Sequence, residues 1–445
     1  MSAPVIGFAG LTHLGLVSAL AVASKGFGVV GYDTDATRVR DIAAGRLPVV
    51  EPGLDELARG CAPRASFSSQ VKDLAACDLV YISSDVPTDD RGQSDLSGIS
   101  ASIAQVIATL SPRALLVVLC QVPPGFTRGL PLPPERLFYQ VETLVFGRAV
   151  ERATRPERFI VGCADPAKAL PEAFAAVLGA FGCPILPMRY ESAELAKIAI
   201  NCCLVASVTI ANTLAELSER VGADWSEIVP ALRLDARIGQ GAYLAPGLGI
   251  AGGNLERDLA TIARLSQETG SEASVIQAFV ANSRHRRDWA ARVLHDEVLR
   301  SKADALIGIL GLAYKENTHS TKNSPSLALI ATLAPYRLKV YDPVVPPAAA
   351  DHPRAQGAES ALAAAEGVDA LAIMTPWPAF RDLKPADLAR VMVGRTVLDP
   401  YRILDGRAAA PAGLDYFTLG VPPHHAKEYC CALSLIHISE PTRRS

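Results

Sequence analysis

Short apolar runs alternate with helix-length amphipathic segments through the first 185 residues, and the same alternation returns near the end of the chain. This pattern is typical of βαβ units, in which parallel strands form a sheet that helices cover. We predict strands at residues 4–9, 28–32, 79–83, 115–119 and 158–161, and again at 305–310, 338–341, 370–374 and 396–398. The sequence therefore indicates two α/β units, which are candidates for a common fold.

Between these units the pattern changes to long helices, from residue 192 to about residue 287. Residues 193–220 are apolar at helical spacing and contain few helix-breaking residues. A helical block between two α/β units is a usual place for a subunit interface, so we expect a homodimer. The predicted fold class is α/β, with two Rossmann-like doubly wound domains joined by a central helical domain. The predicted bounds of the three parts are 1–187, 188–298 and 299–431.

Charge and hydropathy argue against some classes of partner. Hydrophobic residues make up 49% and charged residues 20% of the sequence, so large cores can form. The formal net charge of -3 gives no electrostatic reason to bind nucleic acid or an anionic membrane. We expect no bilayer-spanning run, because the apolar stretches are short or interrupted by glycine and charge. Residues 5–30 lack the basic start of a signal peptide.

The nine cysteines are scattered and include no C-x-x-C pair. An odd number at irregular spacing argues against both a disulfide framework and a zinc site. The histidines are few and are never at the spacing of metal ligands. We therefore expect reduced, buried thiols in a cytoplasmic protein that holds no metal.

The first predicted strand leads into a glycine-containing turn, in the segment VIGFAGLTHLGL at 5–16. Gly10 permits a tight turn, and Gly15 lets the following helix pack close to the strand. The start of that helix then offers N–H groups to a pyrophosphate. Thr12 stands where the pattern G-x-G-x-x-G has its middle glycine, so a side chain partly obstructs the backbone. A tight turn without any ligand is the alternative interpretation.

An acidic residue supports the dinucleotide interpretation of this turn. Asp33 ends the next predicted strand, near the spacing expected for an acid that binds ribose hydroxyls. An acid at this position favours NAD over NADP, because it would repel a 2′-phosphate. Arg38 lies one turn further on and weakens that preference.

Several further segments resemble, in the correct order, those of the UDP-glucose/GDP-mannose dehydrogenase family. The segments are GRLPVVEPGLDEL at 45–57, VPTD at 86–89 with SDL at 94–96, AELAKIAIN at 193–201, RIG at 237–239 with Tyr243 and PG at 246–247, GLAYKENT at 311–318 with SP at 324–325, TPW at 375–377 with Phe380, and DPYR at 399–402. The resemblance runs from about residue 3 to residue 420. It implies a first domain that binds NAD and a third domain that binds a nucleotide-sugar. It also implies oxidation of the sugar C6 hydroxyl, as for UDP-glucose in polysaccharide precursor synthesis.

The resemblance assigns roles to individual residues. Lys197 and Asn201 are four residues apart on a helix, so they share one face, where they can hold a sugar oxygen and stabilise its negative charge. Without the resemblance they would be a solvated lysine and a helix-surface asparagine. The residues expected to be catalytic are Lys197, Asn201 and Asp258, together with Asn254 at the position of the family's nucleophile. The residues expected to bind the cofactor are Gly10, Leu11, Leu14, Gly15, Asp33, Arg38, Gln121, Arg257 and Lys322. The residues expected to bind the substrate are Glu142, Lys197, Asn201, Arg237, Tyr243 and Lys315. Arg237 fits equally a neighbouring subunit's site or a structural ion pair.

The chain departs from the family where the second oxidation takes place. Family members pass two hydrides to two NAD molecules, and the second step uses a thiolate that captures the aldehyde. The family's GFGGSCFPKD reads GIAGGNLERD here at 249–258, so Asn254 replaces the cysteine. Asn254 cannot ionise or attack a carbonyl, but it would make a good helix N-cap. Gln121 replaces a water-positioning threonine, and Phe146 replaces the second glutamate of the family's P-E-F-L-R-E-G.

Three hypotheses about function remain open. The first is the full nucleotide-sugar 6-dehydrogenase, and the second is a single hydride transfer that ends at an aldehyde or acts on another alcohol. The third is a protein that binds NAD or a nucleotide-sugar without catalysis. Cys202 and Cys203 adjoin Asn201, but on a helix they point about 100° and 200° away from it. They are therefore poor substitutes for the missing thiol.

The last segment, ALSLIHISEPTRRS at 432–445, resembles translated sequencing-adapter sequence. We expect it to be a non-native tail outside the fold, with an ordinary flexible tail as the alternative.

Overall fold

The computed structural model describes residues 3–87, 89 and 94–426. It divides into two compact units, Met1–Asn201 and Cys202–Ser445. Thr88, residues 427–431 at the end of the predicted third domain, and the tail at 432–445 lie outside the described residues.

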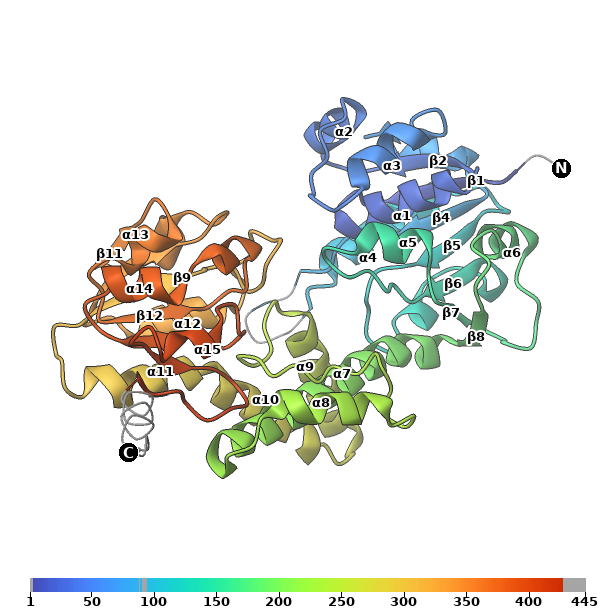
Figure 1. Cartoon of the computed structure of the whole chain (residues 1–445). Helices are drawn as coiled ribbons and strands as arrows, with labels where there is room; N and C mark the ends of the chain where they lie inside the picture. Colours follow the sequence, from blue (N-terminus) through green and yellow to red (C-terminus); the bar gives the residue numbers. More distant parts are fainter. Residues whose placement is uncertain (1–2, 88, 90–93, 427–445) are drawn as a thin grey trace, which may run out of the picture. The chain divides into compact units, whose positions relative to one another are not determined.

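The first unit is built on an eight-stranded sheet with the strand order β3-β2-β1-β4-β5-β6-β7-β8 (Figure 1). Its strands are β1 (Val5–Ala9), β2 (Gly28–Tyr32), β3 (Ala65–Ser68), β4 (Leu79–Ile82), β5 (Leu115–Val118), β6 (Leu137–Gln140), β7 (Phe159–Cys163) and β8 (Ile185–Arg189). The five predicted strands are present within one or two residues at each end. The sequence analysis missed β3, β6 and β8. Of these, β3 and β8 are edge strands, which need no continuous apolar run because one side of an edge strand faces no neighbour.

The sheet is not wholly parallel, and in this respect the prediction of parallel strands is wrong. Strands β6 and β7 pair antiparallel, with Tyr139 opposite Gly162 and Gln140 opposite Val161. All other neighbouring pairs in the sheet run parallel. Because β6 was not predicted, its direction could not be inferred either.

Helices cover both faces of this sheet, which confirms the doubly wound arrangement (Figure 1). One face packs against α1 (His13–Ser24), α2 (Ala36–Ala43), α3 (Leu54–Cys61), α5 (Ala149–Thr154) and α6 (Glu172–Gly179). The other face packs against α4 (Ser97–Thr109) and the first turns of α7 (Tyr190–Val221). The buried apolar residues form two separate clusters, one on each side of the sheet. Such burial on both faces explains the continuous apolar runs of the central strands.

The second unit contains a six-stranded parallel sheet of the order β11-β10-β9-β12-β13-β14. Its strands are β9 (Leu306–Leu310), β10 (Arg337–Tyr341), β11 (Ala355–Gly357), β12 (Ala370–Ile373), β13 (Thr396–Leu398) and β14 (Asp415–Phe417), and its helices are α12 (Pro325–Thr332), α13 (Ala361–Ala365), α14 (Pro385–Val391) and α15 (Gly406–Ala409). The order matches that of the first six strands of the first sheet. The expectation of a common fold and the predicted fold class are therefore confirmed.

The same backbone contact ends the first strand of each sheet. Gly10 follows β1 with φ 101°, and its N–H donates to Tyr32 O at 2.8 Å. Gly311 follows β9 with φ 92°, and its N–H donates to Tyr341 O at 2.7 Å. Both glycines need the left-handed region, which only glycine enters without strain.

The central helices of the second unit are the remainder of α7, α8 (Trp225–Leu234), α9 (Asn254–Thr269), α10 (Ser274–Arg287) and α11 (Trp289–Leu294). Arg286 of α10 is fully buried, and its guanidinium lies 3.1 Å from Glu216 and 3.2 Å from Glu219 of α7. The polar side of α7 in this unit therefore faces α10, where burial makes paired charges necessary.

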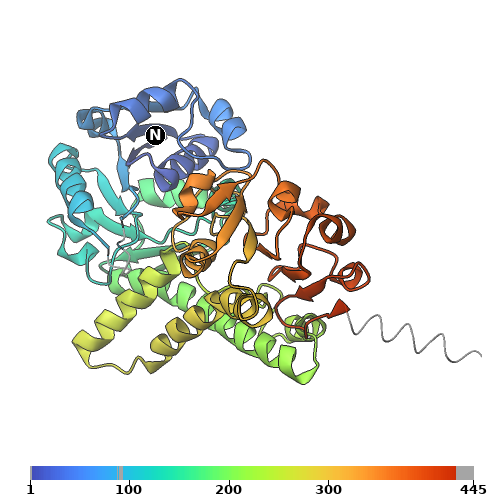
Figure 2. The same cartoon turned by 90° about the vertical axis from the view of Figure 1, so that its left-hand side faces the viewer.

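Helix α7 corrects one expectation. It is one continuous helix of 32 residues, drawn in green in Figure 2, and contains an 18-residue window of mean hydropathy 1.8. By length and composition it meets the test for a membrane span, so the expectation that no run would do so is wrong. Core helices of water-soluble proteins meet the same test, and 33% of this window is buried. Length and composition alone therefore do not place α7 in a membrane.

Candidate functional site

The turn after β1 is shaped by two glycines that accept no side chain. A Cβ on Gly10 would lie 2.1 Å from Ser84 Oγ, and a Cβ on Gly15 would lie 1.8 Å from Gly10 O. The turn stands between β1 and β4, where the strand order of the sheet reverses. In open α/β sheets this is the place where nucleotides bind, beside the first N–H groups of the following helix. The structure thus forms the cradle that a dinucleotide requires.

Asp33 is buried at 6% exposure behind this turn. Its Oδ2 accepts the Leu11 N–H at 2.8 Å, and its Oδ1 accepts the Asp35 N–H and Arg38 Nη1, both at 2.9 Å. A carboxylate has about four acceptor positions, so these three donors leave room for one ribose hydroxyl. Arg38 also lies 3.5 Å from Asp35, so two carboxylates hold its charge.

The corresponding acid of the second sheet is saturated. Asp342 accepts five N–H groups: those of Leu312, Ala313, Val344 and Val345, and the Trp377 indole. These bonds keep the pKa of Asp342 low even though burial acts to raise it. Asp342 therefore fixes the backbone after β9. Asp33 fixes the backbone after β1 in the same way, but its carboxylate can still accept one more hydrogen bond.

Leu11, Leu14 and Thr12 occupy the turn in different ways. The Leu11 and Leu14 side chains are buried in the core, so any contact of theirs with a cofactor would come from the backbone. The Leu11 N–H already donates to Asp33. Thr12 Oγ1 accepts the Asp85 N–H at 3.2 Å, which joins the turn to the end of β4.

The first turns of α7 hold the loop that follows β5. Glu191 pairs with Arg128, and Glu194 accepts the N–H groups of Gly125 at 2.6 Å and Thr127 at 2.8 Å. Burial raises the pKa of Glu194, and the donated N–H groups offset part of that rise. The same loop carries Gln121, which is half-buried and follows the end of β5 by three residues. Helix α7 thereby fixes the loop that carries Gln121.

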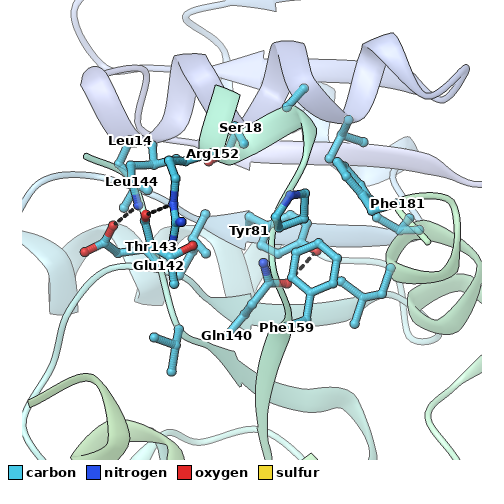
Figure 3. A pocket seen from close by; sticks show the side chains of 18 of the residues that line it. Leu14, Ser18, Tyr81, Gln140, Glu142, Thr143, Leu144, Arg152, Phe159 and Phe181 are labelled. Atoms are coloured by element: carbon cyan, nitrogen blue, oxygen red, sulfur yellow. Dashed lines mark hydrogen bonds between the residues drawn. The ribbon is translucent and has the colours of Figure 1, made fainter. Parts of the chain in front are cut away.

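One helical turn further along α7, Lys197 meets the loop that follows β6. Its Nζ lies 2.7 Å from Glu142 Oε1, and both side chains are largely buried, at 12% and 18% exposure. Glu142 Oε2 accepts the Leu144 N–H at 3.0 Å (Figure 3). Asn201, at 8% exposure, lies one turn beyond Lys197. The first unit thus brings Lys197 and Glu142 together.

In the second unit the loop before α9 follows a path that requires glycine at three positions. Gly249, Gly252 and Gly253 all have positive φ, between 79° and 93°. A Cβ on Gly249 would lie 2.4 Å from Ser283 O, and one on Gly252 would lie 2.7 Å from the Tyr314 ring. The loop is therefore tightly packed although the family's cysteine is absent from it.

Asn254 begins α9, but it does not cap it. The N-cap is Gly253, with φ 93°, and Asn254 is the first helical residue. The prediction of an Asn254 N-cap is wrong because the left-handed Gly253 ends the loop one residue earlier than that prediction placed its end. Asn254 stands at the positive end of a 16-residue helix.

The other predicted site residues that lie in the second unit form two groups. Asp258 and Arg257 are buried in the first turns of α9, and the Lys322 side chain lies along Gly253. Lys315 lies earlier in the loop that carries Lys322, with its Nζ 5.7 Å from the centre of the Tyr314 ring. These four residues surround or adjoin the loop that ends at Gly253. The second group is Arg237 and Tyr243.

Arg237 and Tyr243 lie on an exposed loop. Arg237 is 89% exposed and pairs with Asp235 at 2.6 Å, which raises the pKa of the arginine. The ion pair that the sequence analysis considered for Arg237 is formed with Asp235, and a role in a neighbouring subunit's site stays a prediction. Tyr243 is 49% exposed.

The thiols are poorly suited to replace the missing nucleophile. Burial raises the pKa of Cys120 to about 12. Burial, with the charge of Asp258 and the neighbouring Cys203, raises that of Cys202 to about 11. A nucleophilic cysteine needs a lowered pKa, because the thiolate is the reactive form. The seven cysteines among the described residues are all free, and those residues contain no cluster of metal-binding side chains.

Sequence reasoning missed three polar residues that shape these sites. Glu194 lies inside the quoted segment at 193–201, and Glu51 lies inside that at 45–57, where it pairs with His13. Asp342 follows β10 as Asp33 follows β2, so comparing the two α/β halves would have found it.

Three sequence profiles of one family match the chain in order. The matches are the NAD binding domain at 5–178, the central domain at 191–284 and the UDP binding domain at 308–406 of the UDP-glucose/GDP-mannose dehydrogenase family. A chain with this series of domains is an NAD-dependent oxidoreductase that acts on a nucleotide-sugar. It belongs to the UDP-glucose/GDP-mannose dehydrogenase family.

Individual relatives cover nearly the whole chain. UDP-glucose 6-dehydrogenase TuaD of Bacillus subtilis is 27% identical over 94% of this chain and 93% of its own. UDP-glucose 6-dehydrogenase of Rhizobium meliloti is 28% identical over 93% and 98%. The solved UDP-glucose dehydrogenase from Pyrobaculum islandicum superposes with a TM-score of 0.79 at 27% identity, over 92% of this chain and 98% of that one. The expected family, fold and cofactor are thereby confirmed.

Proposed function

We propose that the protein oxidises the C6 hydroxyl of UDP-glucose or a related UDP-sugar by one hydride transfer to NAD. The primary alcohol and NAD⁺ give an aldehyde, NADH and a proton. The observation that carries this proposal is that Lys197 is paired with Glu142 in the first unit, while Asn254 replaces the thiol that a second oxidation needs.

Different residues of the chain have different roles in this hydride transfer. Bound NAD would supply the hydride acceptor, and the Gly10 turn with Asp33 would hold it. The ammonium of Lys197 and the amide of Asn201 would stabilise negative charge on the sugar oxygen as the hydride leaves carbon. Glu142 keeps the Lys197 ammonium in place, and buried donors of this kind are effective because they need no reorganisation. The hydroxyl proton passes to solvent.

The reaction is expected to end at the aldehyde. Asn254 has no ionisable group, and the raised pKa of Cys202 disfavours the thiolate. Gln121 and Phe146 offer neither the hydroxyl nor the carboxylate that the family uses to direct water.

A panel of nucleotide-sugars tests the proposal. Purified protein with NAD is supplied in turn with UDP-glucose, UDP-galactose, UDP-N-acetylmannosamine and GDP-mannose, and NADH formation is followed by absorbance. NADH with one UDP-sugar, together with an aldehyde trapped by hydroxylamine, supports the proposal. Binding of NAD and UDP-sugar without NADH would instead indicate a protein that binds both without catalysis.

The Asp33→Ala variant should bind NAD about ten- to a hundredfold more weakly. A hydrogen bond to a charged group contributes about 1.5–3 kcal/mol, and 1.4 kcal/mol is about tenfold in affinity. Titration calorimetry with NAD measures the change. The control is Asp41→Ala, which removes an exposed acid of α2 that pairs with Arg46. Equal NAD affinity in Asp33→Ala and in the unmodified protein would contradict the assignment.

We also propose that the protein forms a homodimer through α7. Ile210, Leu214, Leu217 and Val221 are 39–66% exposed. Their spacing of four, three and four residues places them on one face, as in paired helices. Leu217→Glu should put a charge into that interface and give monomers of 47.0 kDa in light scattering. The control is Gln277→Glu, which adds the same charge on α10 and should leave the dimer intact. If the unmodified protein is a monomer, the proposed interface is wrong.

The proposed compartment is the cytoplasm. The seven described cysteines are all free, and several are buried, as expected in a reducing environment.

A further inference from the structure

The side chain of His13 joins two loops that are far apart in the sequence. His13 is the first residue of α1, directly after the turn of the dinucleotide site. Its Nε2 lies 2.9 Å from Glu51 Oε1, and the two side chains are only 10% and 1% exposed. Glu51 also accepts the N–H groups of Gly147 at 2.9 Å and Ala149 at 3.2 Å. Because an ionised carboxylate only accepts, His13 Nε2 carries the hydrogen of this bond.

The His13 ring is also held by an aromatic partner. Phe146 stacks on it with ring centres 4.2 Å apart and planes at 20°. Phe146 precedes Gly147, so the stacked pair and the Glu51 contacts fix the same stretch of chain. An aromatic pair of this geometry contributes about 0.5–1.5 kcal/mol beyond its buried area.

The other end of that stretch carries Glu142. Its two oxygens bind Lys197 of α7 and the Leu144 N–H. The loop at 142–149 is therefore held at both ends by a carboxylate. One carboxylate is tied to α1 through His13, and the other is tied to α7 through Lys197.

A cavity lies beside the first part of this loop. A cavity of about 50 Å³ lies behind residues 140–144, lined by Leu14 and Ser18 of α1 and by Tyr81 of β4 (Figure 3). On that side Arg152 Nε donates to Thr143 O at 3.4 Å, and the Tyr81 hydroxyl donates to Gln140 Oε1 at 3.1 Å. A segment with a void behind it lacks the close contacts that hold a core in place. The polar contacts at the two ends of the loop therefore add to the packing of Leu144 and Ala149 in holding its position.

We propose that His13 is a positioning residue that couples the dinucleotide turn to the placement of Glu142 and Lys197. A cofactor bound at the start of α1 restrains His13, and the Glu51 contacts pass that restraint to the loop of Glu142. Occupancy of the NAD site then alters the affinity for the nucleotide-sugar, and the reverse holds by linkage. This inference rests on the proposed function, because it takes Glu142 and Lys197 to be substrate-site residues.

The test measures this coupling directly. The Kd of UDP-glucose is determined by calorimetry with and without saturating NADH, a pair that cannot react. In the unmodified protein NADH should change the UDP-glucose Kd by about fivefold or more, the lower end of usual coupling. His13→Leu keeps a side chain of similar bulk but removes the hydrogen-bond donor. In this variant NADH should change the UDP-glucose Kd by less than about twofold. His13→Gln places an amide N–H near the position of Nε2 and should restore the coupling.

A matched control separates positioning from general loss of stability. Tyr190→Phe removes another buried hydrogen bond of the first unit, from the Tyr190 hydroxyl to Leu137 O at 2.7 Å. This variant should lower the melting temperature while leaving the coupling factor unchanged. Coupling that is absent from the unmodified protein, survives in His13→Leu, fails to return in His13→Gln, or is lost equally in Tyr190→Phe overturns the proposal.

Failure of the proposed function would look different. In that case no nucleotide-sugar yields NADH, whereas NADH and UDP-glucose affinities remain measurable. The coupling factor and its dependence on residue 13 can then still be read.

Discussion

The unmodified protein, supplied with its UDP-sugar and excess NAD, should form one NADH per sugar consumed, and the Asn254→Cys variant should form more. Position 254 is the first residue of α9, behind the left-handed Gly253. A thiol placed there lies at a helix N-terminus, where the thiolate is favoured. The thiol loses its proton to solvent, the thiolate adds to the aldehyde, and a second hydride transfer to NAD⁺ then gives a thioester and NADH.

The thioester should accumulate on the Asn254→Cys variant. Hydrolysis would need the water-positioning groups that Gln121 and Phe146 have replaced. The second NADH should therefore appear as a burst equal to the enzyme concentration, with a covalent adduct detected by mass spectrometry. Adding Gln121→Thr and Phe146→Glu should release the acid and raise the yield towards two NADH per sugar.

Three outcomes would count against this account. Two NADH per sugar from the unmodified protein would show that Asn254 does not limit the reaction. A burst from Asn254→Ser, which has no thiol, would show that the extra NADH arises elsewhere. Absence of any adduct on Asn254→Cys would show that position 254 does not face the aldehyde.

The Lys197→Met variant should lose about a hundred- to a thousandfold in kcat, while its NAD affinity stays close to that of the unmodified protein. Removal of one preorganised donor to a developing oxyanion typically has an effect of this size. Methionine keeps much of the aliphatic bulk of lysine, so the packing of α7 changes little. Stopped-flow measurement of NADH formation gives kcat, and calorimetry gives the NAD affinity.

Loss of the ion pair needs its own control. In Lys197→Met the carboxylate of Glu142 is left largely buried without its cation, which costs about 3–5 kcal/mol of stability when burial is complete. The Lys197→Met/Glu142→Gln double variant removes that uncompensated charge and should recover most of the melting temperature. Its kcat should stay low. Recovery of kcat together with the melting temperature would mean that Lys197 acts only on stability.

Much of the fold could be predicted because its signals are local. The apolar runs that became β1, β2, β4, β5 and β7 are each continuous within a few residues. The glycines that end β1 and β9 are each required by the positive φ of the backbone at that point, which is a local signal. The edge strands β3 and β8 carried weaker patterns, because pairing on one side alone does not demand an apolar run.

The site was only partly predictable for the same reason. Lys197 and Asn201 share a helix face, which spacing reveals. Contact of Lys197 with Glu142 joins residues 55 positions apart and depends on β6 lying beside β5 in the sheet. No periodicity in the sequence contains that information.

The sequence alone therefore determined the series of domains, the dinucleotide turn and the absence of cysteine at position 254. Each of these features depends only on which residue types stand at given positions of the chain. The tertiary structure decided which polar groups meet. It gave Asp33 its three N–H donors, paired His13 with Glu51 and made Gly253 rather than Asn254 the cap of α9. Such contacts depend on strand order and on where a loop leaves its helix, which are set by packing between distant segments.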